Sequence, residues 1–363
     1  MSGILISGGS SSCKEKNGGL TLREITEGGP LLDSEGNLIV TGWARQPLLD
    51  ANLENVNIYP LKLLQPLRIK RWQYYGITMP THFFSFTISH VGYLASVFAY
   101  VVDFVARKCQ EETLTVPFGS GVVLARSSTS GSCHYCTGRL HLDFYIRSDN
   151  LRVLDVNWPK FGGMGLRANV ELILKPGHES VVNVFPYPNR RFFYTRKVNC
   201  MPASGTIEYD ALYRLSPSDS LGVLDWGVGV WPYRTFWLWG SSSQFLPDGR
   251  TIGLNLGGGI GNDPEVTDNA IILDGRVHKL GAVDFKYDER SLSKPWRMCS
   301  RDGRLELDFA PFFERVAKTD LKVLSSEVHQ VFGHYSGTAV LDDGTKLELK
   351  DLVGWVEVQR AKW

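Results

Sequence analysis

The sequence predicts an all-β fold built from two antiparallel β-barrel or sandwich units that arose by internal duplication, with few short helices. Short runs of alternating apolar and polar residues recur along the 363-residue chain and are separated by Gly, Pro, Asp and Asn, a pattern typical of strands joined by turns. The heptapeptide GRLHLDF at 138–144 returns as GRLELDF at 303–309. The length fits two domains better than one, and the apolar content is sufficient for a large core.

The expected strands follow from alternation and the expected turns from residue type. Alternating runs occupy residues 37–43, 168–175, 205–215, 250–256, 269–275 and 337–358. The segment LDDGT at 341–345 lies inside the last of these runs and predicts a hairpin turn. The segment Pro311 to Asp320, PFFERVAKTD, is the best candidate for a single turn or short helix.

Residues 83–102 form an uncharged stretch of about the length that crosses a bilayer. Ser85, Thr87, Ser89 and His90 weaken a membrane assignment. The second half is rich in Val, Tyr and Phe, which suits a strand covered on both faces. Contact with a membrane through 83–102 is therefore an alternative, and a buried strand is preferred.

The segment WGVGVWPYRTFWLWGSS at 226–242 holds four of the ten tryptophans. Trp231, Tyr233, Trp237 and Trp239 fall on odd positions, which a strand projects to one side. Pro232 indicates that this strand begins, bends or lies at an edge there. The aromatic side either fills a core or lines a cavity for a ligand, and both alternatives stay open at this point.

The repeated heptapeptide predicts that the two units occupy residues 20–195 and 196–363. Asp-Phe pairs at 103–104 and 284–285 precede the two copies in the same order. We expect Leu140 and Leu305 to occupy equivalent places in the two units. The alternative is coincidence in a strand-rich sequence.

Charge and cysteine usage limit the partners. A formal net charge of +1, from 39 basic and 38 acidic residues, argues against nucleic-acid binding. The six cysteines are dispersed and no leader segment is visible, so we expect a cytoplasmic protein with free thiols. Cys133 and Cys136 lack a second ligand pair, so a surface hairpin is favoured over a metal or redox site.

The glycine-rich segment LGGGIGN at 256–262 resembles a dinucleotide-binding loop in part. Its third glycine position is Asn262, and the residues that follow Pro264 are typical of a strand, whereas such a loop needs a helix N-terminus for the pyrophosphate. We therefore expect no cofactor. The glycines instead suit a bulge or a close approach of backbone to a ligand.

Polar residues within apolar runs are the candidates for catalysis. His329 comes first, with Gln330 beside it, because an imidazole transfers protons near neutral pH. Asp225 would be a carboxylic acid with a raised pKa if aromatic side chains desolvate it, which suits protonation of an alkene or an epoxide. The structural alternatives are that His329 caps a carbonyl and that Asp225 closes a turn.

Arg45 and Arg234 are candidate anchors for a ligand carboxylate, with pairing to structural carboxylates as the alternative for both. The sequence contains no Ser-His-Asp order, HExxH motif, paired-carboxylate motif or P-loop. This absence argues against the common hydrolase and phosphotransferase mechanisms.

Several motifs carry a family resemblance. They are GWARQP at 42–47, WGVGVWPY at 226–233, GLNLGGGIGN through TDNAIILDGRVHKLG at 253–281, and EVHQVFGHYSG followed by DLVGWVE. In these the chain resembles the family of domain of unknown function 2804. More distantly it is similar to the lipocalin-like family that includes carotenoid 1,2-hydratases. The resemblance implies a two-unit lipocalin-like fold and no established activity.

These observations predict that a hydrophobic small molecule, such as a lipid or an isoprenoid-like compound, binds in an aromatic-lined β cavity. The first alternative is a cofactor-free hydratase, isomerase or cyclase that uses the same cavity, and the second is a structural scaffold. His329 and Asp225 are the expected catalytic residues. The expected ligand-binding residues are Trp231, Tyr233, Arg234, Trp237, Trp239, Gln330 and Arg45.

Overall fold

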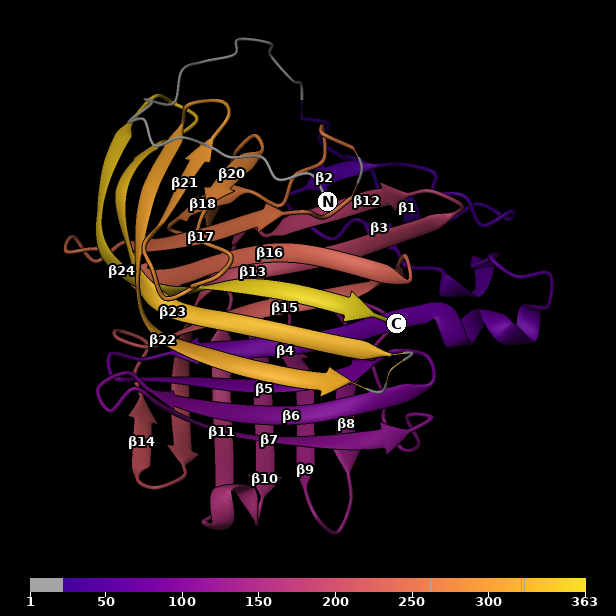
Figure 1. The fold of residues 1–363 in the computed structure, drawn as a ribbon, viewed down its shortest axis with the longest axis horizontal. Coiled ribbons are helices and arrows are strands. Elements are labelled where there is room, and N and C mark those ends of the chain that lie inside the picture. Colours follow the sequence, from indigo (N-terminus) through magenta and orange to yellow (C-terminus); the bar gives the residue numbers. More distant parts are fainter. Residues whose placement is uncertain (1–21, 262, 321, 323) are drawn as a thin grey trace.

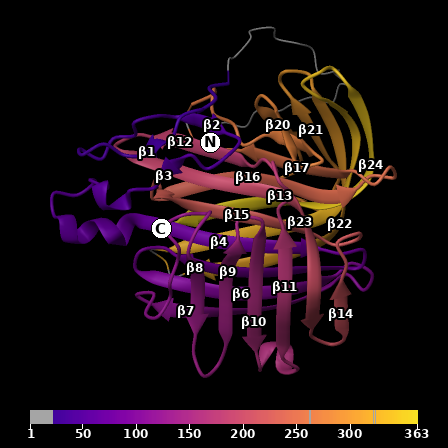
Figure 2. The same ribbon diagram turned by 180° about the vertical axis from the view of Figure 1, so that it is seen from behind.

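The chain folds into two large antiparallel sheets. The computed structural model describes residues 22–261, 263–320, 322 and 324–363. These residues form a 13-stranded sheet, a 9-stranded sheet and a two-stranded parallel pair. Figures 1 and 2 show both sheets from opposite sides, strongly curled. The prediction of an all-β, two-unit, lipocalin-like fold is confirmed.

The first sheet comprises, in spatial order, β7 (Lys108–Pro117), β6 (Leu94–Asp103), β5 (His82–His90), β4 (Ile69–Thr78), β15 (Leu221–Val230), β13 (Arg191–Glu208), β11 (Leu166–Ile173), β10 (Leu151–Trp158), β9 (His141–Ser148) and β8 (Ser132–Cys136). Strand β13 also pairs with β12 (Val181–Tyr187) and β14 (Leu212–Leu215), and β12 pairs with β2 (Gly42–Ala44).

The second sheet comprises, in spatial order, β19 (Arg276–Lys279), β18 (Ala270–Leu273), β17 (Thr251–Gly258), β16 (Arg234–Phe245), β24 (Lys346–Lys362), β23 (Ser325–Val340), β22 (Leu305–Asp320), β21 (Trp296–Ser300) and β20 (Val283–Lys286). The remaining elements are β1 (Gly29–Pro30), β3 (Leu49–Asp50) and the 3-10 helices η1 (Leu53–Asn55), η2 (Lys62–Arg68) and η3 (Phe161–Gly163).

The long strands of the first sheet bury both faces. On β5, Phe84 and Phe86 point into the core of the first sheet, whereas Phe83 points toward the second sheet. The Phe83 ring lies 5.2 Å from that of Phe332 on β23 and 5.0 Å from that of Trp355 on β24, measured between centroids. Figure 1 shows β23 and β24, in yellow, crossing over β4 and β5, in indigo. The two sheets therefore pack through an aromatic layer, separate from the core inside each sheet.

The uncharged stretch at 83–102 forms most of the β5–β6 hairpin. Residues 83–88 of β5 are all buried. The second half, for which a strand covered on both faces is expected, is β6; its residues 99–102 are buried on both faces, whereas Leu94, Ser96 and Phe98 are half-buried. Over the described ranges, the structure contains no helix that is long and apolar enough to cross a membrane.

Gly227 on β15 makes room for an aromatic ring in the layer between the sheets. A Cβ atom at this position would lie 2.5 Å from the Trp72 ring and 2.8 Å from the Phe193 ring. The Trp72 and Phe193 rings contact each other at a tilt of 32°, with centroids 5.2 Å apart. The glycine in WGVGVW therefore allows two rings from neighbouring strands to pack against the backbone.

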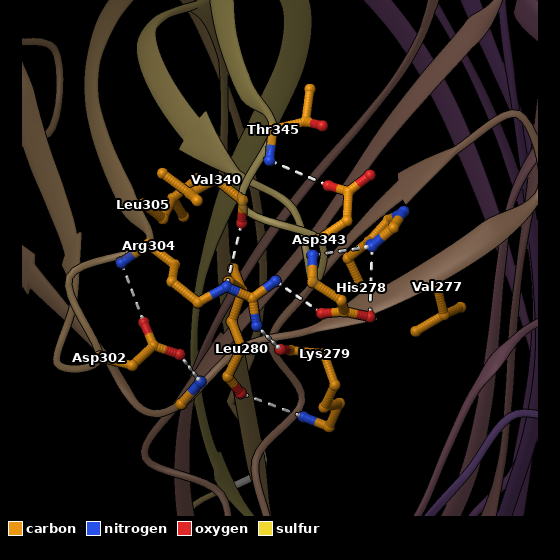
Figure 3. Close-up of polar contacts among 12 residues, drawn as sticks. Val277, His278, Lys279, Leu280, Asp302, Arg304, Leu305, Val340, Asp343 and Thr345 are labelled. Carbon is orange, nitrogen blue, oxygen red and sulfur yellow. Dashed lines mark hydrogen bonds and ion pairs between the residues drawn. The ribbon is translucent and has the colours of Figure 1, made fainter. Parts of the chain in front are cut away.

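The second sheet curls until its two edges approach each other. Strands β19 and β20 follow each other in the chain yet form opposite edges of the sheet. Arg304, just before β22, donates hydrogen bonds to the backbone oxygens of Lys279 (2.8 Å) and Val340 (3.0 Å), as Figure 3 shows. Its guanidinium also lies 2.6 Å from Asp342, which contacts His278 of β19 at 3.2 Å. This cluster connects the β19 edge to β22 and to the β23–β24 turn.

The duplicated heptapeptides have similar surroundings. Leu140 comes directly before β9, which lies between β8 and β10, and Leu305 begins β22, which lies between β21 and β23. Each leucine is buried, Leu140 in the core of the first sheet and Leu305 in that of the second. The boundary predicted at 195/196 falls inside β13, and the chain passes from the first sheet to the second at residues 231–233.

Two predicted elements need correction. The segment Pro311–Asp320 is part of β22 and not a helix. The β22–β23 register shifts between Pro311 and Phe313, and such a bulge accommodates a proline, which lacks a ladder donor. The tryptophan-rich segment is not one strand either, because β15 ends at Val230 and β16 begins at Arg234.

The hairpin predicted at LDDGT is confirmed, because this segment joins β23 to β24. The Leu341 N–H donates to the Thr345 oxygen at 2.9 Å. Gly344 has a φ of +84° in this turn, a conformation that glycine adopts without strain.

We expect Gly227→Ala to destabilise the protein by roughly 1–3 kcal/mol, because the added methyl group overpacks the layer between the sheets. Thermal unfolding followed by circular dichroism measures the effect. Gly138→Ala is the matched control, since a Cβ atom there meets no atom within 4 Å and should change stability by less than about 0.5 kcal/mol. Equal melting temperatures for both variants would contradict the steric argument.

Candidate functional site

A cavity of about 190 Å³ lies between the facing sides of the two sheets. The first sheet contributes residues from β4, β5, β6, β13 and β15, and the second contributes residues from β16, β22, β23 and β24. Nine of the 21 lining residues are aromatic. The lining includes Trp72, Tyr74, Thr87, Tyr100, Lys197, Asp225, Trp231, Trp237, Trp239, Ile260, Asp268, Arg315, Glu357 and Trp363.

Four tryptophans form one continuous part of the wall. Trp231 lies at the centre, with ring centroids 5.9 Å from Trp72, 5.5 Å from Trp237 and 5.9 Å from Trp363. The Nε1 atoms of Trp231 and Trp363 are buried and have no hydrogen-bond partner among the described residues. Buried indole N–H groups normally find an acceptor, so two donors here are unused.

An ion pair between β13 and β15 forms the polar part of the wall. Lys197 Nζ lies 2.6 Å from Asp225 Oδ2 and 4.2 Å from the centre of the Trp239 ring, so the ammonium group is held by a carboxylate and an aromatic face. Both side chains are almost fully buried. Asp225 Oδ1 has no partner in the part of the chain that the structure describes.

Asp268 lies between β17 and β18 and is buried. Asn183 Nδ2 donates to its Oδ1 at 2.7 Å, whereas its Oδ2 is buried without a partner among residues 22–363 as described. Gly257 allows this packing, since a Cβ atom there would lie 2.6 Å from the Asp268 Cβ. Burial raises the pKa of Asp268, and Lys197 opposes that rise.

Glu357 on β24 is hydrogen-bonded to the tryptophan wall. Trp237 Nε1 donates to Glu357 Oε1 at 3.1 Å. Burial raises the pKa of Glu357 to about 6, and the hydrogen bond from Trp237 opposes the rise. A carboxyl group with this pKa exchanges a proton near neutral pH.

A second polar group connects β6 to the second sheet. The Tyr100 hydroxyl donates to Gln330 Oε1 at 2.7 Å and lies 2.9 Å from the Tyr74 hydroxyl. The Arg315 guanidinium lies 4.0 Å from the centre of the Tyr100 ring and forms two hydrogen bonds, of 2.8 and 2.7 Å, with Glu111. Burial raises the pKa of Tyr100 to about 12, so it remains protonated.

The structure brings together only part of the expected site. Asp225, Trp231, Trp237 and Trp239 line the cavity, and Trp237 and Trp239 share one face of β16, as their parity predicted. Gln330 contacts Tyr100 at the edge of the cavity.

His329 does not reach the cavity. It lies on the opposite face of β23, where Nδ1 contacts Glu314 at 2.7 Å and Nε2 contacts Glu327 at 3.1 Å. Successive residues of a strand point to opposite sides, so Gln330 and His329 cannot both face the same space. The expectation that His329 meets the tryptophans is wrong for this geometry.

The other expected binding residues lie elsewhere. Tyr233 and Arg234 are exposed, because the chain turns at residues 231–233 between the two sheets. Arg45 contacts Glu24 at 3.0 Å and Glu179 at 2.8 Å, so it has the structural pairing that was the alternative.

Sequence analysis missed Lys197, Asp268, Arg315 and Glu357. A usable indication existed for Glu357, because Trp355, Glu357 and Gln359 share one strand parity that includes an aromatic residue. Lys197 likewise interrupts a buried strand. Arg315 was missed because residues 311–320 were interpreted as a helix, which places Arg315 on no strand face. Nothing in the local pattern singled out Asp268.

The glycine-rich loop contributes a residue to the cavity wall, and the two cysteines at 133 and 136 are free thiols. Ile260 of the loop lines the cavity, and residue 262 lies outside the described residues. Cys133 is buried, Cys136 is exposed, and both are free thiols, whereas Cys13 lies outside the described residues. No group of three or more His, Cys, Asp or Glu side chains in the described ranges could hold a metal ion.

Three solved structures are similar to this chain, and the one with a TM-score above 0.5 supports the fold. The crystal structure of CghA with Sch210972 matches with a TM-score of 0.53 and 11% identity, over 92% of this chain and 97% of that one. Kievitone hydratase from Nectria haematococca matches with a TM-score of 0.48 and 10% identity, over 92% and 98%. A putative AttH from Nitrosomonas europaea matches with a TM-score of 0.40 and 13% identity, over 80% and 92%.

No protein with a curated description matches the sequence. The family model of the domain of unknown function DUF2804 matches residues 22–363, and the chain therefore belongs to the DUF2804 family.

Proposed function

We propose that this protein binds a hydrophobic small molecule in the cavity between its two sheets. The observation that carries the proposal is a small cavity with nine aromatic residues in its lining, where five buried polar atoms have no hydrogen-bond partner among the described residues. These atoms are Thr87 Oγ1, Asp225 Oδ1, Trp231 Nε1, Asp268 Oδ2 and Trp363 Nε1. A well-packed interface pairs such atoms. A ligand with an apolar body and a polar group would satisfy both parts of the wall.

The alternative of a structural scaffold predicts a filled interface. The cavity of about 190 Å³ argues against it, since protein interiors normally leave few voids larger than a water molecule. A dry apolar cavity of roughly 150 Å³ holds a benzene molecule, so an aromatic ring with a short chain is a suitable probe for this space. The neutral compound 4-phenylbutanol meets that description.

We expect Trp237→Ala to weaken the binding of 4-phenylbutanol by about tenfold, because each tenfold change corresponds to about 1.4 kcal/mol and a large apolar contact contributes at least that amount. Isothermal titration calorimetry measures the dissociation constant. Phe236→Ala is the matched control, since Phe236 follows the opposite parity on the same strand and is partly exposed. Equal losses in both variants, or a Trp237→Ala variant that loses roughly 3–5 kcal/mol of stability, would favour a core role.

A second candidate is a cofactor-free enzyme that acts on the bound molecule. Glu357 favours it, because a buried carboxyl group with a pKa of about 6 is suited to donate or accept a proton. The Lys197–Asp225 pair nearby offers fixed charges that would stabilise charge developing in a substrate. Hydration needs such proton transfer, and so do isomerisations and cyclisations that pass through a carbocation or an enol.

We expect Glu357→Gln to abolish proton transfer and to leave binding of 4-phenylbutanol unchanged. The substrate pool is the material extracted with organic solvent from the purified protein. The extract is incubated with wild type or variant, once in D₂O and once in H₂O, and analysed by mass spectrometry. Deuterium incorporation in D₂O reports proton transfer, and a product about 18 mass units heavier in H₂O reports hydration. The same turnover by wild type and Glu357→Gln would exclude Glu357 as the proton donor, and no turnover by either would leave a binding protein.

A further inference from the structure

We infer that the cavity selects a ligand that carries a positive charge on its hydrophobic body, as a protonated organic amine does. This inference rests on the proposed binding function and specifies the chemistry of the ligand. It is drawn from the charges that line the cavity, from the aromatic faces beside them and from the carboxylate oxygens that lack partners.

The lining residues carry more negative than positive charges. Lys197 is paired with Asp225 at 2.6 Å, and Arg315 is paired with Glu111 at 2.7 Å. Two further lining carboxyl groups, those of Asp268 and Glu357, have no cationic partner within 4 Å among the described residues. A buried carboxylate without a cation is costly, and a cationic ligand would reduce that cost.

The aromatic wall already accommodates cations at three places, one of which is Lys70, 5.7 Å from the centre of the Trp363 ring. Lys197 lies over Trp239 and Arg315 lies over Tyr100, at 4.2 and 4.0 Å from the ring centres. In the described part of the chain, Trp231 and Trp237 have no cation over their rings. Indole rings attract cations most strongly of the aromatic side chains, so these two remain available to an ammonium group.

Two lysines lie behind the wall and outside the lining. Lys279 donates to Thr267 Oγ1 at 2.6 Å, and Lys70 donates to the Val91 oxygen at 2.5 Å. Burial lowers the pKa of Lys279, and it lowers the pKa of Lys70 to about 7. Their positive charges are therefore weakened near neutral pH and compensate the carboxylates only in part.

The unpartnered oxygens favour an ammonium group that has N–H bonds. Asp225 Oδ1 and Asp268 Oδ2 are buried and accept no hydrogen bond from a described residue. Asp225 and Asp268 are 8% and 2% exposed, so bulk water does not satisfy these oxygens freely. A primary ammonium group has three N–H donors and would form charge-assisted hydrogen bonds to them.

The test compares three probes of the same shape: 4-phenylbutylamine, which is protonated, 4-phenylbutanol, which is neutral, and 4-phenylbutyrate, which is anionic. We expect the amine to bind about tenfold more tightly than the alcohol at pH 7.5 and the butyrate to bind most weakly, measured by calorimetry. Between pH 7.5 and 5 the advantage of the amine should decrease, since Glu357 and Asp268 become protonated and the lysines become charged. The affinity for the alcohol should stay constant.

Variants identify the groups responsible. Asp268→Asn and Glu357→Gln should each remove most of the advantage of the amine over the alcohol, because each removes one negative charge and keeps a side chain of nearly the same size. Asp274→Asn is the control, because its carboxylate is exposed and pairs with Lys175. Melting temperatures show whether each variant is folded, and the alcohol reports an intact cavity.

The outcomes separate the two proposals. If the alcohol or the butyrate binds as tightly as the amine, the inference about charge is wrong and the binding function stands. If the advantage of the amine persists in both cavity variants, or decreases equally in Asp274→Asn, the assignment to Asp268 and Glu357 is wrong. If none of the three probes binds the wild-type protein, the binding function fails together with the inference.

Discussion

The constraint on which this structure depends is that the long central strands have two buried faces. Each of β4, β5, β6, β13 and β15 contributes alternate residues to the core of the first sheet and to the aromatic layer against the second sheet. A strand has only two sides, so none of its side chains faces solvent over most of its length. Every polar residue on these strands must therefore find a partner inside the protein.

The aromatic layer between the sheets contains the site because it meets that requirement incompletely. Lys197 and Asp225 pair with each other, and Arg315 pairs with Glu111, but other polar atoms have no partner in the described part of the chain. Buried ion pairs contribute little to stability relative to apolar packing. Apolar side chains alone would fill this layer at a lower energetic cost. Ion pairs beside a cavity are therefore the physical reason to assign this region to ligand binding.

Contacts between the two edges of the second sheet hold part of the cavity wall in place. The cluster around Arg304 holds the backbone of Lys279 at the end of β19. The Lys279 ammonium group in turn donates to Thr267 and to the Asn269 oxygen, the residues on either side of Asp268. The position of Asp268 in the wall thus depends on contacts of a neighbouring strand that does not itself line the cavity. Such support is what keeps a polar binding group in a fixed orientation.

The sequence by itself determined the all-β class and the LDDGT hairpin, because alternation and turn residues are local properties. It also determined the paired heptapeptides and the parity that places Trp237 and Trp239 on one face. It also selected Asp225. Only the tertiary structure decided that Lys197, Asp268 and Glu357 join it and that His329 does not. Lys197 lies in the first sheet, whereas Glu357 and His329 lie in the second. Asp268 comes from the segment before β18, so the distances among these residues depend on contacts far apart in the sequence. Whether a side chain of a strand faces one core or the other depends on which sheet covers it, and a local pattern does not contain that information.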